Sequence, residues 1–159
     1  MRVSFFTAIL LSVTGLVSPL ERTCAATEDT ASVDRAVVAF HDALNLLFQG
    51  DAEPMKNLWS HADDITYMGP MGGFNLGWSA ISSIWDKQAD LKLAGNVIAE
   101  NIHVAMSPSL AVCHYMEKGS NLVDGEKQEV SLRTTTTFRK ENGIWKVIGH
   151  HTDTLPYLE

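Results

Sequence analysis

The spacing of hydrophobic residues along the chain changes from a helical period to a strand period. From Ala31 to Gln49 apolar side chains recur every three or four residues, which predicts an amphipathic helix of about five turns. Thr30 or Ser32 can cap the start of this helix, and Gly50 suits its end. The first structured element is therefore expected to be a long helix with one buried face.

Two shorter helices and one short strand are expected in the middle of the chain. Pro54 is favoured in the first turn of a short helix. The residues ITYM at 65–68 suit a strand that ends in a glycine-rich loop at 69–73. In the third helix Trp78 and Trp85 share one apolar face, which suits a hydrophobic core, and Trp78 also suits the wall of a ligand pocket.

Beyond Leu91 apolar and polar residues alternate with the period of a β-strand. Turn signals at Ser107-Pro108, Asp124-Gly125 and Asn142-Gly143 divide this part into four segments: NVIAENIHVAM, SLAVCHYMEK, KQEVSLRTTTTFRK and IWKVIGHHTD. Helices followed by a meander of strands predict an α+β domain in which helices cover one face of a curved antiparallel sheet. The open end of such a cone is a natural pocket.

The first 26 residues read as a secretory signal. Arg2 gives a short basic start, residues 3–17 are mainly apolar, and small residues precede the expected cleavage point after Ala26. The apolar stretch is shorter than the span of about 20 residues that a membrane helix needs. A retained anchor or a lipid on Cys24 is the alternative. Cleavage would leave residues 27–159 as a single domain that is periplasmic or secreted.

Charge and cysteine content narrow the functions that this domain can have. The chain has a net charge of −7 and no basic run, which argues against nucleic-acid binding. Cleavage would leave Cys113 as the one cysteine, so no intrachain disulfide could form. Its place in a predicted strand suits a buried, unreactive thiol. We expect no contact with the membrane once the signal is removed.

Three stretches of sequence occur in a fixed order: LFQGD at the end of the first helix, DDITYMGPMGGFNLGW before the third helix, and LRTTTTFRKENGIWKVIGHHTD near the C-terminus. Together they resemble the nuclear transport factor 2-like superfamily, specifically its SnoaL-like bacterial branch. The resemblance covers the chain from Ala31 to Pro156. It implies a cone-shaped α+β fold, often dimeric, with a curved sheet wrapped on the long helix, two further helices, and a pocket on the concave face.

This resemblance implies no single reaction. Members include ketosteroid isomerases, polyketide cyclases, dehydratases, an epoxide hydrolase, a carbonic anhydrase group and non-catalytic assembly domains, because chemistry lies in the site and not in the fold. We expect a small-molecule pocket, either in an acid/base enzyme of isomerase, cyclase, dehydratase or hydratase type or in a non-catalytic binding or dimerisation module. Carbonic-anhydrase-like hydration of CO2 is a third possibility. We expect a homodimer without cofactor or metal.

The two histidines of the stretch GHHTD must point to opposite faces of the last strand, because side chains alternate along a strand. A two-residue turn at Asn142-Gly143 puts His151 on the face of Phe138, and a three-residue turn puts His150 there. The resemblance favours His150 and Thr152, since carbonic-anhydrase-like members end in His-His-Ser-Ser with the first histidine and the residue after the pair in the pocket. Here a threonine and an aspartate replace the two serines.

A histidine can accept or donate a proton near neutral pH, because its reference pKa is about 6.5. We expect His150 or His151 to be the catalytic base, tuned by a carboxylate such as Asp64. Adjacent histidines on a strand diverge, whereas zinc needs three or four converging ligands, so we expect no metal site. Candidate ligand contacts are the polar and aromatic side chains at the predicted mouth of the cone: Tyr67, Trp78, Tyr115, Thr134, Thr136 and Thr152.

Overall fold

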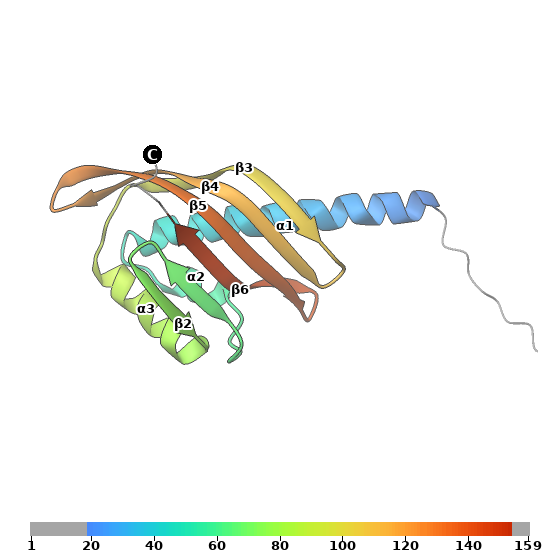
Figure 1. The fold of residues 1–159 in the computed structure, drawn as a ribbon, viewed down its shortest axis with the longest axis horizontal. Helices are drawn as coiled ribbons and strands as arrows, with labels where there is room; N and C mark the ends of the chain where they lie inside the picture. Colours follow the sequence, from blue (N-terminus) through green and yellow to red (C-terminus); the bar gives the residue numbers. More distant parts are fainter. Residues whose placement is uncertain (1–18, 154–159) are drawn as a thin grey trace, which may run out of the picture.

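The computed structural model describes residues 19–153, which form an α+β fold with a curved sheet and helices on its concave side (Figure 1). Residues 1–18 and 154–159, and with them most of the predicted secretory signal, lie outside the described residues. The predicted fold class is confirmed. The elements in chain order are α1 (Pro19–Leu47), α2 (Glu53–Leu58), β1 (Thr66–Gly69), β2 (Gly72–Leu76), α3 (Trp78–Asp90), β3 (Asn96–Met106), β4 (Leu110–Val123), β5 (Glu126–Glu141) and β6 (Ile144–Asp153).

The six strands form one sheet in the order β2-β1-β6-β5-β4-β3. Neighbouring strands are antiparallel except β1 and β6, which run parallel. The sequence predicted only antiparallel neighbours. The parallel pair arises because β1 joins the sheet beside the last strand, and the chain then crosses through α3 to begin the meander at the opposite edge.

The loop expected at residues 69–73 is shorter than predicted, because Gly72 and Gly73 already belong to β2, the edge strand that pairs with β1. Gly72 and Gly73 have φ values of +86° and +90°, a region that other residues avoid. They let the chain reverse direction directly after β1. The glycines that indicated a loop therefore mark the turn of a hairpin.

The first helix is longer than its hydrophobic pattern predicts. It begins at Pro19 and not near Ala31, so the expected cleavage point after Ala26 lies within it. Good helix formers between these positions, mainly alanine, glutamate and arginine, account for the extension. The predicted end is confirmed, since Gly50 has a φ of +103° and donates its backbone N–H to the carbonyl of Leu47.

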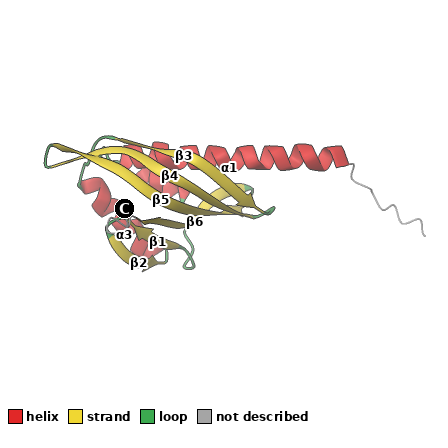
Figure 2. Ribbon diagram, turned by 45° about the horizontal axis from the view of Figure 1, so that its top comes forward, coloured by secondary structure: helices red, strands yellow, loops and turns green. Residues whose placement is uncertain are grey.

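Helix α1 lies along the concave side of the sheet, and α3 packs beside it (Figure 2). One stripe of α1 is buried against the sheet, with Val33, Val37 and Leu47 fully covered. Trp85 on α3 and Trp59 after α2 fill the space between the helices and the strands. Each such side chain contributes about 1.5–3 kcal/mol when it is buried. The helices thus cover part of the concave face of the sheet.

The turn between β5 and β6 holds two residues, because Glu141 pairs with Ile144. Asn142 and Gly143 have φ values of +50° and +82°, as a two-residue hairpin turn of this kind requires. A regular ladder from such a turn would place His151 on the concave face. If the length of this turn alone decided the faces, as the sequence suggested, His151 would point to the concave side and His150 outward.

A β-bulge in β6 overturns that interpretation. Phe138 pairs with Val147 whereas the preceding Thr137 pairs with Gly149, which leaves Ile148 as an extra residue. The extra residue exchanges the two faces of β6 beyond it. His150 therefore points to the concave side although the turn holds two residues.

Candidate functional site

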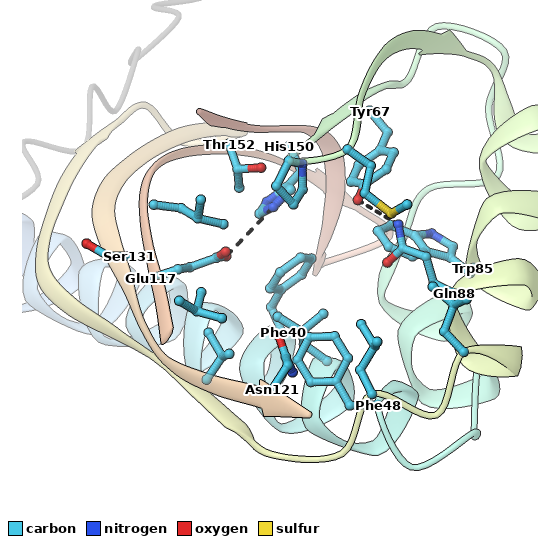
Figure 3. A pocket seen from close by; sticks show the side chains of 18 of the residues that line it. Phe40, Phe48, Tyr67, Trp85, Gln88, Glu117, Asn121, Ser131, His150 and Thr152 are labelled. Atoms are coloured by element: carbon cyan, nitrogen blue, oxygen red, sulfur yellow. Dashed lines mark hydrogen bonds and ion pairs between the residues drawn. The ribbon is translucent and has the colours of Figure 1, made fainter. Parts of the chain in front are cut away.

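A cavity of about 480 Å³ lies between the concave face of the sheet and the helices (Figure 3). Its volume falls in the range that holds a small organic ligand. Apolar side chains from α1 and α3, such as Phe40 and Trp85, form one part of its wall. Polar side chains from β4 and β6, namely Glu117, His150 and Thr152, form another.

Strand register brings the polar groups of the concave face together. Thr134 on β5 pairs with Tyr115 on β4 and with Thr152 on β6, so these three side chains form one row across the sheet. In the next row Thr136 pairs with His150. Because inward positions alternate along each strand, the two rows lie side by side on one face. All five side chains are buried.

A hydrogen-bond chain connects His150 to Tyr115 through Thr136. The hydroxyl of Tyr115 lies 2.7 Å from Thr136 Oγ1, which lies 2.9 Å from His150 Nδ1. Burial raises the pKa of Tyr115 well above 10, so the phenol keeps its proton, and Thr136 is its hydrogen-bond partner among the described residues. We assign Tyr115 as the donor to Thr136 and Thr136 as the donor to Nδ1, because this direction uses the phenol's proton within the chain. The neutral imidazole then carries its hydrogen on Nε2.

His150 is uncharged at neutral pH. Its side chain is 5% exposed, and burial lowers its pKa from 6.5 to about 4, against the attraction of the carboxylate of Glu117. The ring stacks on Phe40 with a centroid distance of 4.7 Å, which fixes its plane. The site thus holds an imidazole that can donate a hydrogen bond from Nε2 without carrying a charge.

Glu117 lies between two histidines. Its Oε1 is 3.7 Å from Nε2 of His150 and 3.4 Å from Nε2 of His41 on α1. Oε1 has no hydrogen-bond partner among the described residues, and the same holds for Nε2 of His41. His41 donates its Nδ1 hydrogen to the carbonyl of Val37 at 2.8 Å, which directs Nε2 toward the carboxylate. A buried carboxylate with free hydrogen-bonding capacity therefore faces the cavity beside His150.

Two threonine hydroxyls of the concave face also have free capacity. Oγ1 of Thr134 and Oγ1 of Thr152 are buried and have no hydrogen-bond partner among the residues that the structure describes. Buried polar groups in folded proteins are nearly always hydrogen-bonded, so free ones that line a cavity, such as Oε1 of Glu117 and Oγ1 of Thr152, indicate a place for a ligand. Thr152 lines the cavity directly.

Tyr67 lies on the opposite side of His150 from the rows of threonines. Its backbone pairs with His150 across β1 and β6, and its hydroxyl accepts a hydrogen bond of 2.9 Å from the amide of Gln88. Burial raises its pKa to about 12, so the phenol is uncharged. Its ring contacts that of Trp85 at a centroid distance of 4.6 Å, and both line the cavity.

The structure places three of the predicted site residues on the cavity wall: His150, Tyr67 and Thr152. Tyr115, Thr134 and Thr136 lie in the same buried rows. Three others were expected in the pocket but lie outside this cavity: His151, Asp64 and Trp78.

Each of these three has a physical reason for its position. His151 is exposed on the outer face of β6, because it follows the inward His150. Asp64 pairs with Arg139 at 2.7 Å, and this hydrogen bond holds the pKa of the carboxyl below its usual value. Trp78 stacks on His61 with ring centroids 3.9 Å apart, at the surface between α2 and α3.

Sequence reasoning missed the central carboxylate and its helical partner. Glu117 is two residues beyond Tyr115 on β4, so strand alternation already placed both on one face. His41 is four residues beyond Val37 and therefore lies on the apolar stripe of the helix. A charged residue inside a hydrophobic strand face and a histidine inside a helical stripe were the available signals.

No group of three or more histidine, cysteine, aspartate or glutamate side chains in residues 19–153 is arranged to hold a metal ion. None of the described helices combines the length and the hydrophobicity needed to cross a lipid bilayer.

The sequence profile of the SnoaL-like domain family matches residues 33–155. A search of curated proteins finds no match. Among solved structures, the fold is similar to a candidate dehydratase of the nuclear transport factor 2 (NTF2)-like family from Streptomyces avermitilis, with 19% identity over 82% of this chain and 98% of that protein and a TM-score of 0.72.

Two further solved structures share the fold. A candidate aromatic ring hydroxylase from Novosphingobium aromaticivorans is 16% identical, with 81% of this chain and 90% of that one covered and a TM-score of 0.68. A candidate calcium/calmodulin-dependent protein kinase type II association domain from Thiobacillus denitrificans is also 16% identical, with coverages of 77% and 94% and a TM-score of 0.63. At these identities the similarity shows the fold alone.

Proposed function

Because the chain belongs to the SnoaL-like domain family, we propose that it binds a small organic molecule in the cavity and catalyses a proton transfer on it. In this proposal Glu117 accepts the proton and His150 donates a hydrogen bond to the ligand. The reaction is of the isomerase or dehydratase type. The protein side chains carry out the acid/base steps.

One observation carries this proposal: a carboxylate oxygen without a hydrogen-bond partner faces the cavity beside a neutral imidazole. Glu117 is 4% exposed, and a buried acceptor of this kind costs about 1–3 kcal/mol when it is left without a donor. Such a cost persists in functional sites, where the group is kept free for a substrate.

The geometry supports a two-part mechanism. Glu117 removes a proton from a C–H bond next to a carbonyl group, so that an O–H bond forms on the carboxylate and the electron pair moves to the carbonyl oxygen. Nε2–H of His150 and the hydroxyl of Thr152 can donate hydrogen bonds to that oxygen as it gains negative charge. Return of the proton to another carbon gives isomerisation. Loss of a hydroxyl from the neighbouring carbon, which takes the proton back from Glu117 and leaves as water, gives dehydration. The candidate dehydratase from Streptomyces avermitilis shares this fold and supports the same reaction class.

Exchange of ligand protons with deuterium tests the proposal without knowledge of the natural substrate. Small aryl ketones, with 2-tetralone as the first probe, are incubated with the full chain in D2O, and loss of the proton signal next to the carbonyl is followed by NMR. We expect faster exchange than in buffer. Glu117→Gln should lower the rate by about 100-fold or more, as loss of a catalytic base typically does.

A matched pair of histidine variants provides the control. His150→Gln should slow exchange by about tenfold to 100-fold, because a donor to the developing oxyanion is lost. His151→Gln changes the same residue type on the outer face and should leave the rate unchanged. Equal rates for the wild type and Glu117→Gln would contradict the role of Glu117, and absence of acceleration for every ketone would reject the reaction class.

Carbon dioxide hydration is a second candidate, because His150 and Thr152 both face the cavity as the carbonic-anhydrase-like resemblance implies. Stopped-flow measurement of CO2 hydration separates the two candidates. A rate above that of buffer, lost in His150→Gln, would favour hydration over the ketone chemistry.

The N-terminal sequence supports export to the periplasm or the exterior, and the resemblance supports a homodimer. The mass of the protein recovered from fractionated cells tests cleavage after Ala26. Native mass spectrometry tests the dimer, and a dimer without any small-molecule binding would favour a non-catalytic assembly module.

A further inference from the structure

The charged side chains that line the cavity are acidic. Glu117 and Glu129 line it, whereas no lysine or arginine does so among the described residues. Glu129 is exposed and already forms an ion pair with Lys127 at 2.8 Å. His150 is uncharged at neutral pH because burial lowers its pKa to about 4. The charge that the wall presents to a ligand is therefore the negative charge of Glu117.

Glu117 is deeply buried and has room for a donor. Its Oε1 has no hydrogen-bond partner among the described residues, although His41 Nε2 is only 3.4 Å away. No hydrogen bond joins these two atoms, so the carboxylate is incompletely paired. A buried charge is strongly disfavoured unless a paired and hydrogen-bonded group offsets it. A positively charged N–H donor on a ligand would supply both the charge and the hydrogen bond.

Aromatic rings line the rest of the same cavity. Phe40, Phe48, Tyr67 and Trp85 contribute to its wall, and Tyr67 and Trp85 lie across the cavity from Glu117 (Figure 3). Ring faces attract cations that approach within about 6 Å of their centre, and cages of such rings bind alkylammonium groups. An ammonium group in this cavity would lie between aromatic faces and a carboxylate.

We infer that the ligand of this cavity carries a positively charged amine, which Glu117 and the surrounding aromatic rings hold in place. The inference rests on the proposed function, since it assumes that the cavity is the ligand site. It also suits the proposed chemistry: one oxygen of Glu117 would hold the amine while the other accepts the proton, and a positive nitrogen makes neighbouring C–H bonds more acidic. An anionic ligand would bring a second negative charge beside a buried carboxylate.

Three probes with one skeleton and different charges test the inference: 4-phenylbutylamine, 4-phenylbutan-1-ol and 4-phenylbutanoate. Binding of each to the full chain is measured by calorimetry at pH 7. We expect the amine to bind at least about tenfold more tightly than the alcohol, a ratio that a single charged hydrogen bond can supply. The carboxylate should bind more weakly than the alcohol.

Two variants assign the preference to the cavity. In Glu117→Gln the amine should lose its advantage over the alcohol, while the alcohol still binds, which also shows that the variant is folded. Glu100→Gln removes the same charge from an exposed position on β3, outside the cavity, and should keep the full preference.

An alcohol that binds the wild type as tightly as the amine would overturn the inference and leave the proposed function standing. A preference that survives in Glu117→Gln would overturn it as well, and failure of all three probes to bind would overturn both.

Discussion

Replacing Glu117 with glutamine should make the fold more stable. Glu117 is 4% exposed and its Oε1 has no hydrogen-bond partner among the described residues, so the folded state carries most of the cost of an unpaired buried acceptor. That cost is about 1–3 kcal/mol. Glutamine has nearly the same shape, carries no charge, and can donate an N–H to Nε2 of His41, which also lacks a partner. We expect the free energy of unfolding to rise by about 1–2 kcal/mol.

For a chain of this length 1 kcal/mol corresponds to a shift of about 2–4 °C in Tm, so the variant should melt roughly 2–8 °C higher than the wild type. Urea unfolding at pH 7 and scanning calorimetry measure the two quantities independently. Glu100→Gln, on the exposed outer face, should stay within about 0.5 kcal/mol of the wild type.

The opposite sign would refute this reasoning. If Glu117 and His41 formed a well-paired buried ion pair, removal of one partner would destabilise the fold by about 3–5 kcal/mol. A Tm well below that of the wild type would therefore make Glu117 a structural residue. A higher Tm together with loss of deuterium exchange would identify a residue that is kept at a cost in stability because the site needs it.

Three further predictions concern individual residues. Because burial lowers the pKa of His150 from 6.5 to about 4, its contribution to stability is complete above pH 6.5 and lost as the pH falls toward 4. The free energy of unfolding should fall by roughly 3 kcal/mol over this range, and urea unfolding of His150→Asn should show a flatter pH dependence. Gly95→Ala should lower the free energy of unfolding by more than about 2 kcal/mol, because Gly95 has a φ of +82° and a Cβ there would collide with the carbonyl of Ser120. Urea unfolding that is the same as for the wild type would contradict this. Cys113 is fully buried and its pKa is raised to about 12, so Ellman's reagent should label it in urea but leave it unmodified in the native protein at pH 8. Rapid labelling of the native protein would show instead that β4 is exposed.

The sequence predicted the layout of the fold well because its hydrophobic periods are clear. The alternation from residue 96 onward located β3 to β6, and the apolar stripe of α1 located the helix that closes the cone. The start of α1 was misplaced because helix formers continue beyond the amphipathic stretch. The strand β2 was missed because glycine and proline around residue 70 indicate both loops and hairpin turns.

The candidate site could be predicted only in part, since it depends on one inserted residue. Ile148 forms the bulge, and nothing in its own type distinguishes it from a regular strand residue. Turn length alone therefore gave the wrong face for His151, and the resemblance gave the right direction for His150 and Thr152. The contact of His41 with Glu117 joins residues 76 positions apart, so no local pattern could show it.

A crystal structure of the full chain grown with 2-tetralone tests the account most directly. We expect the ketone to lie in the cavity between Phe40 and Trp85, with its oxygen about 3 Å from Nε2 of His150 and the carbon next to the carbonyl directed at Glu117. We also expect the bulge at Ile148 with His151 on the outer face. A ketone bound on the outer face of the sheet, or a regular β6 with His150 turned away from the cavity, would contradict the account.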